Sequence, residues 1–473
     1  MDNDKCFYIR ILSPVHVGCD EVYEPTGFVV DERAGVLTAF DPLDFFRRLG
    51  GQDKGRFADI CRKGTVDSIM ELYKFMREKT FPGHQVGMCE GLVAHYQKTL
   101  SFSNRDRKKI QQELNNFAIS RTSFDPTTQK PYIPGSVIKG ALRTAYLNHM
   151  AKSKTVNYDR RDRKAADVLE KGLLEYQRLE NDPFRLLKVS DFHPVGPCRT
   201  QIVFAVNEKK TASQFPARGP YQILEIIEPG TIFTGTIRVV EPLNRAVVAT
   251  PLSEKTVLDS ANEFYRREMM RENEELEEAD IPPFLPVGKE PGIRLRIGRH
   301  SGAESVTIEG HRQIRIMKGK GEKAGFSTKG ATTFWLASAM ASGYRKTNLK
   351  PFGWVSLGIL SEEMAAALVS QAEADEAAVG TAPVDGLSAH VAPKPPIMPK
   401  AEPRHEKWDG ATVSWNPGMR DVTAVWRDKK AQGEGALVPG NLRGRLIDKR
   451  KSIKTSVTVE LVGNGFRIVD IQG

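Results

Sequence analysis

The chain has 473 residues, of which 40% are hydrophobic and 27% charged, a composition typical of a soluble globular protein of two or three domains. Its formal net charge of +10 favours a nucleic acid or another polyanionic partner, although an acidic protein surface would also fit. Five scattered cysteines without a C-x-x-C pair argue against disulfides and zinc, and no signal-like N-terminus or long apolar run is present, so we expect a cytoplasmic protein without metal, cofactor or membrane contact.

The first hundred residues are expected to form short strands followed by helices. Strands are predicted over residues 7–12, 27–31 and 35–40. Asp41 and Pro42 predict the start of a helix, because an aspartate caps free backbone N–H groups and proline fits the first helical position. Helical periodicity returns at residues 63–79 and 104–117.

The segment YIPGSVIKGALRTAYL, residues 132–147, carries the most specific pattern in the chain. It predicts a helix from about Ser136 to Met150, in which Lys139 and Arg143 share one face. In the plainest interpretation, Ser136 caps the helix and Lys139 is solvated. In a second interpretation, the positive helix start and the two cations hold an RNA phosphate backbone, with Gly135 allowing close approach.

Ser136 and Lys139 also spell S-x-x-K, the nucleophile motif of penicillin-binding enzymes. Such enzymes need an S-x-N element and a K-T-G strand as well. The chain offers S-D-F at residues 190–192 and K-G at residues 329–330, so the amide and the hydroxyl are both missing. A serine hydrolase is therefore a poor explanation of this segment.

Further strands and one long helix are expected up to residue 360. Residues 186–192 and 200–206 predict strands, and residues 221–240 predict a hairpin whose turn is Glu228, Pro229 and Gly230. Residues 254–280 predict a charged helix with four apolar anchors, namely Phe264, Tyr265, Met269 and Leu276.

Two basic loops with glycines lie in the following stretch. The first, IGRHSG, contains Arg299 and His300, and the second, KGKGEKAG, contains Lys318 and Lys320. Such loops either lie against RNA phosphates or are ordinary solvated loops. Because no G-K-[ST] closes the second loop, we do not expect nucleotide hydrolysis.

The amino-acid composition of the chain changes after residue 361. We expect one region at residues 1–362, an Ala/Pro-rich linker at 363–407 and a small β-rich basic domain at 408–473. The last domain is predicted to be a small closed barrel that resembles an OB-fold. Trp415, Trp426 and the cations of RGRLIDKRKSIK could bind RNA there, or could be core tryptophans beside a solvated face.

Several quoted segments together resemble the RAMP superfamily, the subunits of type III CRISPR effector complexes. I-P-G-S-x-x-K-G-A-L-R-T-A is similar to the signature segment of that superfamily. SPVHVGCDEVYEP, LLKVSDF, EIIEPGTIFTGTI, GIRLRIGRHSG and KPFGWVSLGI resemble other family elements in the same order. Within the superfamily, the pattern over about residues 7–360 looks most like the type III-A Csm-complex subunit that caps the backbone at the crRNA 3′ end.

The resemblance implies an α+β fold with two tandem ferredoxin-like (RRM-like) units and no catalysis by the chain itself. It implies binding of the crRNA backbone, contact with other Csm-complex RAMP subunits, and a role in crRNA maturation and antiviral defence. Target RNA and a docked host nuclease are further partners that such a complex would bring. The RNA contacts are expected at Gly135, Ser136, Lys139, Arg143, His16, Arg299, His300, Lys318 and Lys320.

Two alternatives stay open from the sequence. Standalone RAMP endoribonucleases use histidine on RNA, so His16 could serve as a general acid or base, although a structural or phosphate-contacting role fits it better. A scaffold subunit of the related type III-B complex is the other alternative. Asp31, Asp41 and Asp44 imitate the catalytic aspartate of the repeated backbone subunit, but each is better explained as a turn or cap residue.

Overall fold

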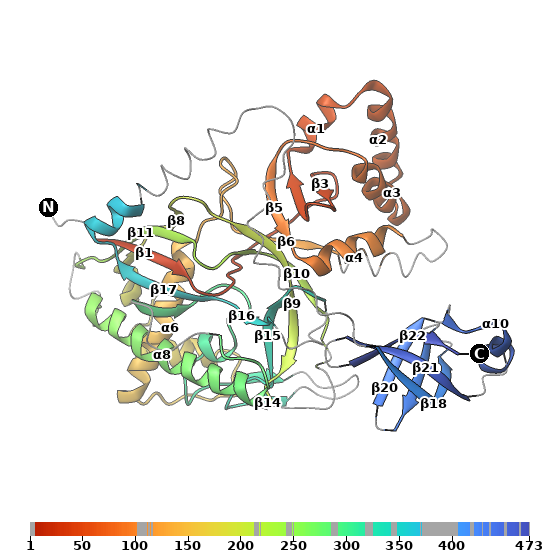
Figure 1. Ribbon diagram of the computed structural model, residues 1–473. Helices are drawn as coiled ribbons and strands as arrows, with labels where there is room; N and C mark the ends of the chain where they lie inside the picture. Colours follow the sequence, from red (N-terminus) through yellow and green to blue (C-terminus); the bar gives the residue numbers. More distant parts are fainter. Residues whose placement is uncertain are drawn as a thin grey trace. The chain divides into compact units, whose positions relative to one another are not determined.

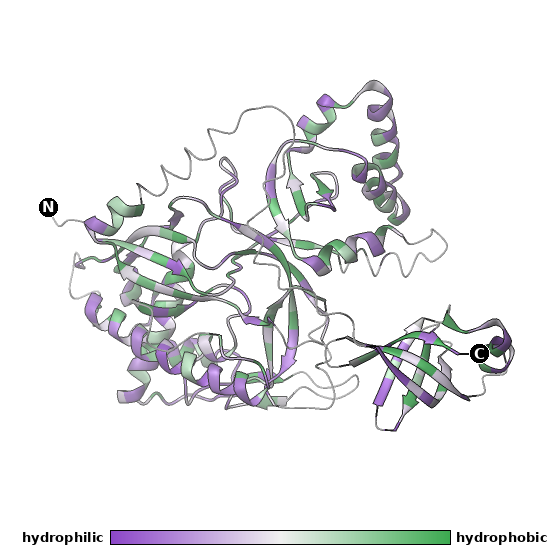
Figure 2. Ribbon diagram, viewed as in Figure 1, coloured by the Kyte–Doolittle hydropathy of each residue, from purple (hydrophilic) through white to green (hydrophobic). Residues whose placement is uncertain are grey.

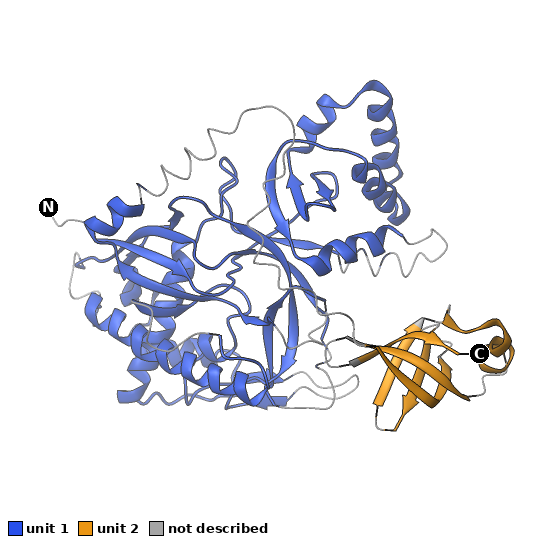
Figure 3. Cartoon of the chain, viewed as in Figure 1, with its two compact units in different colours: residues 1–385 blue, residues 386–473 orange. Residues whose placement is uncertain are grey.

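A computed structural model gives the fold in two compact units, Met1–Asp385 and Gly386–Gly473 (Figure 3). The division lies within the segment predicted as a linker, most of which is outside the described residues. The structure describes residues 5–101, 111, 114, 117–211, 217, 219–242, 248, 250–284, 292–316, 325–341, 348–368, 370, 405–416, 421–427, 429–434, 437–448, 452–462 and 465–472.

The first sheet has the strand order β12-β17-β1-β11-β7, with β8 also paired to β11 (Figure 1). Its strands are β1 (Cys6–Ile11), β7 (Leu187–Val189), β8 (His193–Pro194), β11 (Ile232–Val239), β12 (Ile293–Arg296) and β17 (Trp354–Ile359). All neighbours are antiparallel. Strand β1, helix α6 (Gly135–Ser153), β7, β11, helix α8 (Glu254–Glu278) and β17 follow the β-α-β-β-α-β order of a ferredoxin-like unit, with β12 added at the edge.

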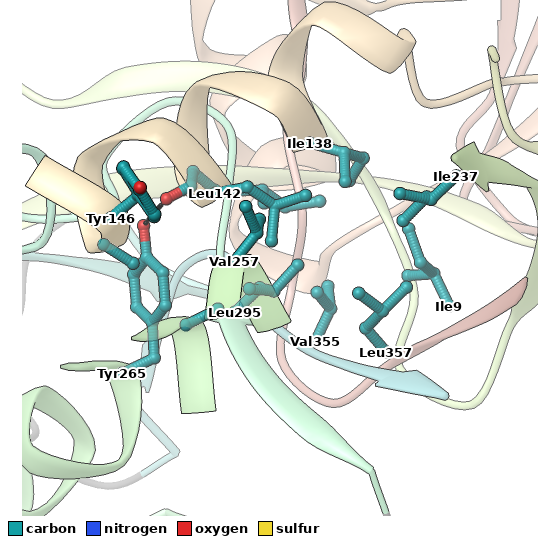
Figure 4. Packing of buried hydrophobic residues seen from close by; sticks show 14 of the residues in the cluster. Ile9, Ile138, Leu142, Tyr146, Ile237, Val257, Tyr265, Leu295, Val355 and Leu357 are labelled. Carbon is teal, nitrogen blue, oxygen red and sulfur yellow. Dashed lines mark hydrogen bonds between the residues drawn. The ribbon is translucent and has the colours of Figure 1, made fainter. Parts of the chain in front are cut away.

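The core of this unit lies between the sheet and helices α6 and α8. Figure 4 shows Leu142 and Ile138 of α6 pointing toward Ile9, Ile237 and Leu357 of the sheet, and all are buried. Each such aliphatic side chain contributes about 1.5–3 kcal/mol when fully buried. The periodicity of the signature segment is therefore that of a helix packed on a sheet, and the predicted helix is confirmed.

Helix α8 is longer and more polar than a core helix usually is (Figure 2). Its four predicted apolar anchors are all buried, as expected. Glu268 and Glu272 are buried too, which the periodicity of the sequence does not indicate. Glu272 pairs with Arg296. Glu268 belongs to a separate network of ion pairs, defined here as the α8 charge network, which joins Glu268, Glu275 and Glu304 to Lys210, Arg271 and Arg312.

The α8 charge network keeps Glu304 ionised despite burial. Burial by itself would raise the pKa of Glu304, but its ion pairs with Lys210 and Arg271 lower that pKa to about 2. The Lys210 Nζ atom lies 2.6 Å from Glu304 Oε1 and 2.8 Å from Glu275 Oε2. Some charged residues of helix α8, such as Glu268, are thus part of the interior. From the sequence alone, they would be assigned to a solvent-exposed face of the helix.

The second sheet has the order β2-β6-β10-β9-β5-β4-β3, and β9 also pairs with β15, which pairs with β16. Its strands are β2 (Gly18–Val22), β3 (Phe28–Asp31), β4 (Val36–Ala39), β5 (His84–Met88), β6 (Ile119–Thr122), β9 (Thr200–Lys209), β10 (Gln222–Ile227), β15 (Thr333–Ser338) and β16 (Lys350–Pro351). Helix α4 (Glu90–Leu100) connects β5 to β6, and its buried side chains belong to the core of this sheet. The α+β class is therefore confirmed for the first unit.

Helices α1 (Pro42–Arg48), α2 (Gly51–Lys63) and α3 (Val66–Arg77) surround a small core of their own, centred on Phe45, Phe57 and Phe75. Asp41 caps α1 by accepting hydrogen bonds from the N–H groups of Leu43 and Asp44, as predicted. Asp31 accepts from two N–H groups of the following turn, and Asp44 pairs with Arg47. Asp31 and Asp41 therefore have the turn and cap roles that the sequence favoured, whereas Asp44 forms a surface ion pair that the sequence did not predict.

The predicted hairpin at residues 221–240 is wrong. Both strands form, but β10 pairs with β9 and β6 in the second sheet, whereas β11 pairs with β1 and β7 in the first. Gly230, at a φ of +95°, donates its N–H to the carbonyl of Ile11 rather than closing a hairpin. Adjacent β-branched runs joined by a turn usually pair with each other, but here each strand pairs with strands from elsewhere in the chain.

The second unit is a closed five-stranded barrel, as predicted. The strands β18 (His405–Asn416), β19 (Asp421–Trp426), β20 (Lys429–Glu434), β21 (Ile453–Val462) and β22 (Gly465–Ile471) close in the order β18-β19-β20-β22-β21. Helix α10 (Gly440–Arg443) and a π-helical turn (Gly444–Asp448) stand between the third and fourth strands, the arrangement of an OB-fold. Trp408 is buried, while Trp415 and Trp426 pack half-buried against the same core.

The remaining elements are short, apart from helix α7. They are α7 (Ala165–Leu174), the 3-10 turns Leu179–Asn181, Pro183–Arg185 and Glu304–Val306, and the ribbon of β13 (Ile314–Ile316) and β14 (Gly325–Ser327). Among the described residues, no helix is both long enough and apolar enough to span a bilayer, and no group of three His, Cys, Asp or Glu side chains is placed to hold a metal ion.

Candidate nucleic-acid interface

Four of the segments singled out in the sequence meet where the chain passes between the two sheets. The N–H of Ile227 donates to the carbonyl of Val15 (2.7 Å), that of Arg299 to His16 (2.8 Å) and that of Gly353 to Pro14 (2.9 Å). These bonds join residues 14–16, 227–230, 297–299 and 353, which we call the sheet junction. Figure 1 shows β1, β10, β11 and β17 arriving there from both sheets.

His16 lies inside the sheet junction and is completely buried. Its Nδ1–H donates to the backbone carbonyl of Glu225 (2.7 Å), and its Nε2 has no hydrogen-bond partner among the described residues. Burial lowers the pKa of His16 to about 4, so the ring is neutral at pH 7. The predicted RNA contact at His16 is therefore wrong, because its ring cannot reach a strand bound on the surface.

Acidification is expected to destabilise the first unit through His16. The histidine titrates near pH 6.5 in the unfolded chain and near pH 4 in the folded one, so the unfolded state takes up a proton first. Stability that is complete above pH 6.5 is then lost toward pH 4, by about 2 kcal/mol at pH 5. Urea unfolding of wild type and His16→Gln at pH 7.5 and 5 measures this, and an equal loss in both proteins would contradict it.

The loop with Arg299 and His300 is held against His16 by backbone contacts. Gly298 has a φ of +78°, and a Cβ atom there would lie 2.4 Å from the carbonyl oxygen of His16. His300 stacks on Trp335 with ring centroids 4.5 Å apart, and its Nε2 lies 3.1 Å from Gln222 Oε1. Burial, followed by the nearby charge of Arg299, lowers the pKa of His300 to about 3.

Arg299 and His300 thus have different positions in the loop. The half-buried ring of His300 packs on Trp335, and its predicted RNA contact stays a prediction. Arg299 is exposed, and no carboxylate of the described chain pairs with it. Of the two, Arg299 is the side chain that can meet a phosphate at the junction surface.

The start of α6 differs from the predicted cap. Pro134 occupies the N-cap position and has no side chain that can accept a hydrogen bond, and Ser136 is exposed in the first turn rather than at the cap. The N–H of Gly135 donates to Asp191 Oδ1 at 2.8 Å. A Cβ atom on Gly135 would lie 2.4 Å from the carbonyl oxygen of Val189, so the glycine admits the protein's own backbone, and its N–H is not available to RNA.

Lys139 is half-buried beside strand β7. Its Nζ donates to the carbonyl of Leu187 at 2.9 Å, so the fully solvated interpretation is wrong. Burial lowers the pKa of Lys139, the nearby charge of Lys188 lowers it further, and Asp182 opposes both. Lys188 is exposed on β7, which pairs only with β11 among the described strands. We call Lys139 and Lys188 the cationic edge.

Arg143 points into the protein rather than toward a ligand. Its guanidinium lies 2.5 Å from Glu170 Oε1 and 3.0 Å from Asp182 Oδ2, and it stacks over Phe184 at 4.8 Å. Its side chain is 19% exposed. The sequence placed Arg143 correctly on the same helix as Lys139 but could not show that two distant carboxylates would neutralise it, so we assign it a structural role.

Lys318 and Lys320 lie outside the described residues, and their predicted RNA contacts stay predictions. In the barrel, Arg443, Arg445 and Lys454 are exposed, whereas the other three cations of that cluster are also outside the described residues. Sequence reasoning missed Lys188. The signal that could have found it is the alternation in LLKVSDF, which turns Lys188 outward between buried Leu187 and half-buried Val189.

Comparison with known proteins identifies one family and several solved structures of similar fold. A family model described as the RAMP superfamily matches residues 8–320. A chain of the cryo-EM structure of a Csm–crRNA–target RNA ternary complex of a type III-A CRISPR-Cas system is 20% identical, with a TM-score of 0.52, over 75% of this chain and 100% of that one. The crystal structure of Csm5 from T. onnurineus is 17% identical, with a TM-score of 0.44, over 74% of this chain and 99% of that one. No curated protein matches.

Proposed function

The chain belongs to the RAMP superfamily, and from this membership we propose that it is a crRNA-binding subunit of a type III-A CRISPR (Csm) surveillance complex. The shared fold with a chain of a Csm–crRNA–target RNA complex supports the proposal, since that whole chain is covered by the match. The net charge of +10 suits a protein that lies along a polyanion.

The observation that carries the proposal is the cationic edge. Lys139 and Lys188 lie close enough for one charge to lower the pKa of the other, and Lys188 has no carboxylate partner within the described chain. Asp182, the acid nearest to Lys139, is already paired with Arg143, and two neighbouring cations that have no ion-pair partner of their own among the described residues favour an anion between them. Arg299 adds an exposed cation at the sheet junction, which is connected to the start of α6 through the hydrogen bonds of Ser123 with Val17 and Tyr132.

In this proposal the subunit binds without cutting. It would contact phosphates and so hold RNA without reading its sequence. It would cap the backbone filament near the crRNA 3′ end. In this position it would support crRNA maturation and antiviral defence. Other Csm-complex RAMP subunits would be its neighbours in the cytoplasm, target RNA would pair with the guide, and a host nuclease would be free to dock. The endoribonuclease alternative rests on His16, and the burial of that ring removes its support. The type III-B scaffold alternative is less favoured, because the matched fold comes from a type III-A complex.

RNA binding by the full chain is expected to fall with salt and to vary little with sequence. Each phosphate contact that releases a counterion from a single strand lowers the slope of log affinity against log salt by about 0.7. Fluorescence anisotropy with a guide-length RNA and with its scrambled version, from 50 to 300 mM salt, measures both properties. A flat salt dependence, a strong preference for one sequence, or cleavage of the RNA by the purified chain would overturn the proposal.

A further inference from the structure

A second surface feature of the first unit lies further along α6. A groove of about 420 Å³ runs between α6, the loop that leads into α7, and residues 306–313. Its apolar lining includes Leu147, Leu169 and Val306, the last of which is 57% exposed. Other lining side chains are polar or aromatic. A half-apolar groove with a few convergent polar groups is the usual form of a small-ligand site.

Two rings form the aromatic part of the groove. The Tyr158 hydroxyl lies 2.8 Å from His311 Nδ1, and the ring centroids are 5.7 Å apart at an angle of 32°. Burial, followed by the charge of Arg160, lowers the pKa of His311, so the ring is neutral at pH 7. Because the hydroxyl and Nδ1 satisfy each other, both rings are held in place and offer flat, uncharged surfaces.

Two arginines, Arg160 and Arg163, line the same groove. Arg160 is fixed by two bonds, since its Nη2 donates to the carbonyl of Gly310 (3.0 Å) and its own carbonyl accepts from Gln313 Nε2 (2.7 Å). Arg163 is exposed and has no ion-pair partner among the described residues. The opposing acids are Glu170, which Arg143 neutralises, and Asp162, whose Oδ1 accepts from the N–H of Lys164.

We propose that this groove binds a nucleoside phosphate, with the base against the rings of Tyr158 and His311 and the phosphate at Arg160 and Arg163. The source that fits the position is an unpaired nucleotide of an RNA strand, since the groove lies on α6 one to two turns beyond Lys139 of the cationic edge. The choice of RNA rests on the proposed function, whereas the binding of a nucleoside phosphate does not. Stacking and charge together would hold such a nucleotide without reading the whole strand.

The test uses the full chain and two probes, a single-stranded RNA that carries one 4-thiouridine and free adenosine 5′-monophosphate. Arg163→Glu removes an exposed cation and Tyr158→Leu keeps apolar bulk while removing the stacking ring. Lys74→Glu, at an exposed position of α3, is the matched control for charge. We expect photo-crosslinks to peptides containing Tyr158 or His311, and a loss of RNA affinity of about fivefold or more in Arg163→Glu and Tyr158→Leu but not in Lys74→Glu.

The outcomes distinguish an RNA nucleotide from a free nucleotide as the ligand of the groove. They also distinguish a failure of the groove proposal from a failure of the proposed function. Weaker RNA binding in both groove variants supports an RNA nucleotide in the groove. Binding of the free nucleotide that Arg163→Glu abolishes, together with unchanged RNA binding, supports a nucleoside phosphate site and overturns the RNA source. Unchanged binding of both probes overturns the groove. If wild type binds no RNA at all, the proposed function fails, and the arm with the free nucleotide still decides the groove.

Discussion

Arg296→Met is expected to lower the free energy of unfolding of the first unit by about 3–5 kcal/mol, the usual cost of leaving one partner of a buried ion pair behind. Arg296 and Glu272 are 2% and 5% exposed, with Nη1 2.6 Å from Oε1. Glu272 also accepts from the indole N–H of Trp354 at 2.6 Å, and Arg296 Nε donates to the carbonyl of Phe352 at 3.0 Å. Methionine fills much of the arginine volume but supplies no donor, so a buried carboxylate and a carbonyl both lose a partner.

The double replacement Arg296→Met/Glu272→Gln is the control for this prediction. The amide of glutamine removes the charge, and its oxygen can still accept from the Trp354 indole. We therefore expect the double variant to be more stable than Arg296→Met alone by at least 1 kcal/mol. Denaturant unfolding followed by tryptophan fluorescence measures the cycle. The cycle includes the single variant Glu272→Gln, and a cost of the double variant equal to the sum of the two single costs would show that the pair is not coupled.

Lys139→Gln/Lys188→Glu is expected to weaken guide-RNA binding at least tenfold. Glutamine at position 139 can keep the donation to the carbonyl of Leu187, while glutamate at position 188 reverses an exposed charge. If each lysine meets one phosphate of the single strand, the salt slope should become shallower by about 1.4. Anisotropy titrations at several salt concentrations, with unfolding curves as a check on stability, measure both effects.

Lys74→Glu provides the comparison for the RNA experiment, because it changes an exposed lysine in the separate α1–α3 core. It reverses one charge, as Lys188→Glu does, and should leave RNA affinity and salt slope close to those of wild type. Should both variants weaken RNA binding equally, the effect would come from net charge alone. The cationic edge would then have no special part in binding.

Local features of the chain were largely predictable. The cap of α1 depends on Asp41 and Pro42 at adjacent positions, and helix α6 depends on apolar residues at helical spacing within one segment. The barrel follows from alternating residues and turn residues after position 404. In each case the interaction that decides the structure lies within a few residues or one strand, so the pattern is visible in the sequence.

The roles of individual site residues were less predictable. Arg143 and Lys139 look equivalent as two cations four residues apart, yet Arg143 has Glu170 and Asp182 as partners and Lys139 has a backbone carbonyl. His16 looks like a surface histidine in a turn, but that turn lies beneath the loop of Arg299. Each difference depends on residues at least 27 positions away, whose approach no local pattern encodes.

By itself, the sequence determined the α+β class, the separate barrel, the helix of the signature segment and the family to which these elements belong. Only the tertiary structure decided that β10 and β11 belong to two different sheets. It also decided that the side chains of His16, His300 and Arg143 pack against other parts of the protein. Lys188 and Arg299, in contrast, are exposed. The physical reason is that strand pairing and burial are competitions among distant segments. A lysine or arginine is available to an anionic ligand only where the fold has not already paired it with a carboxylate from a distant segment.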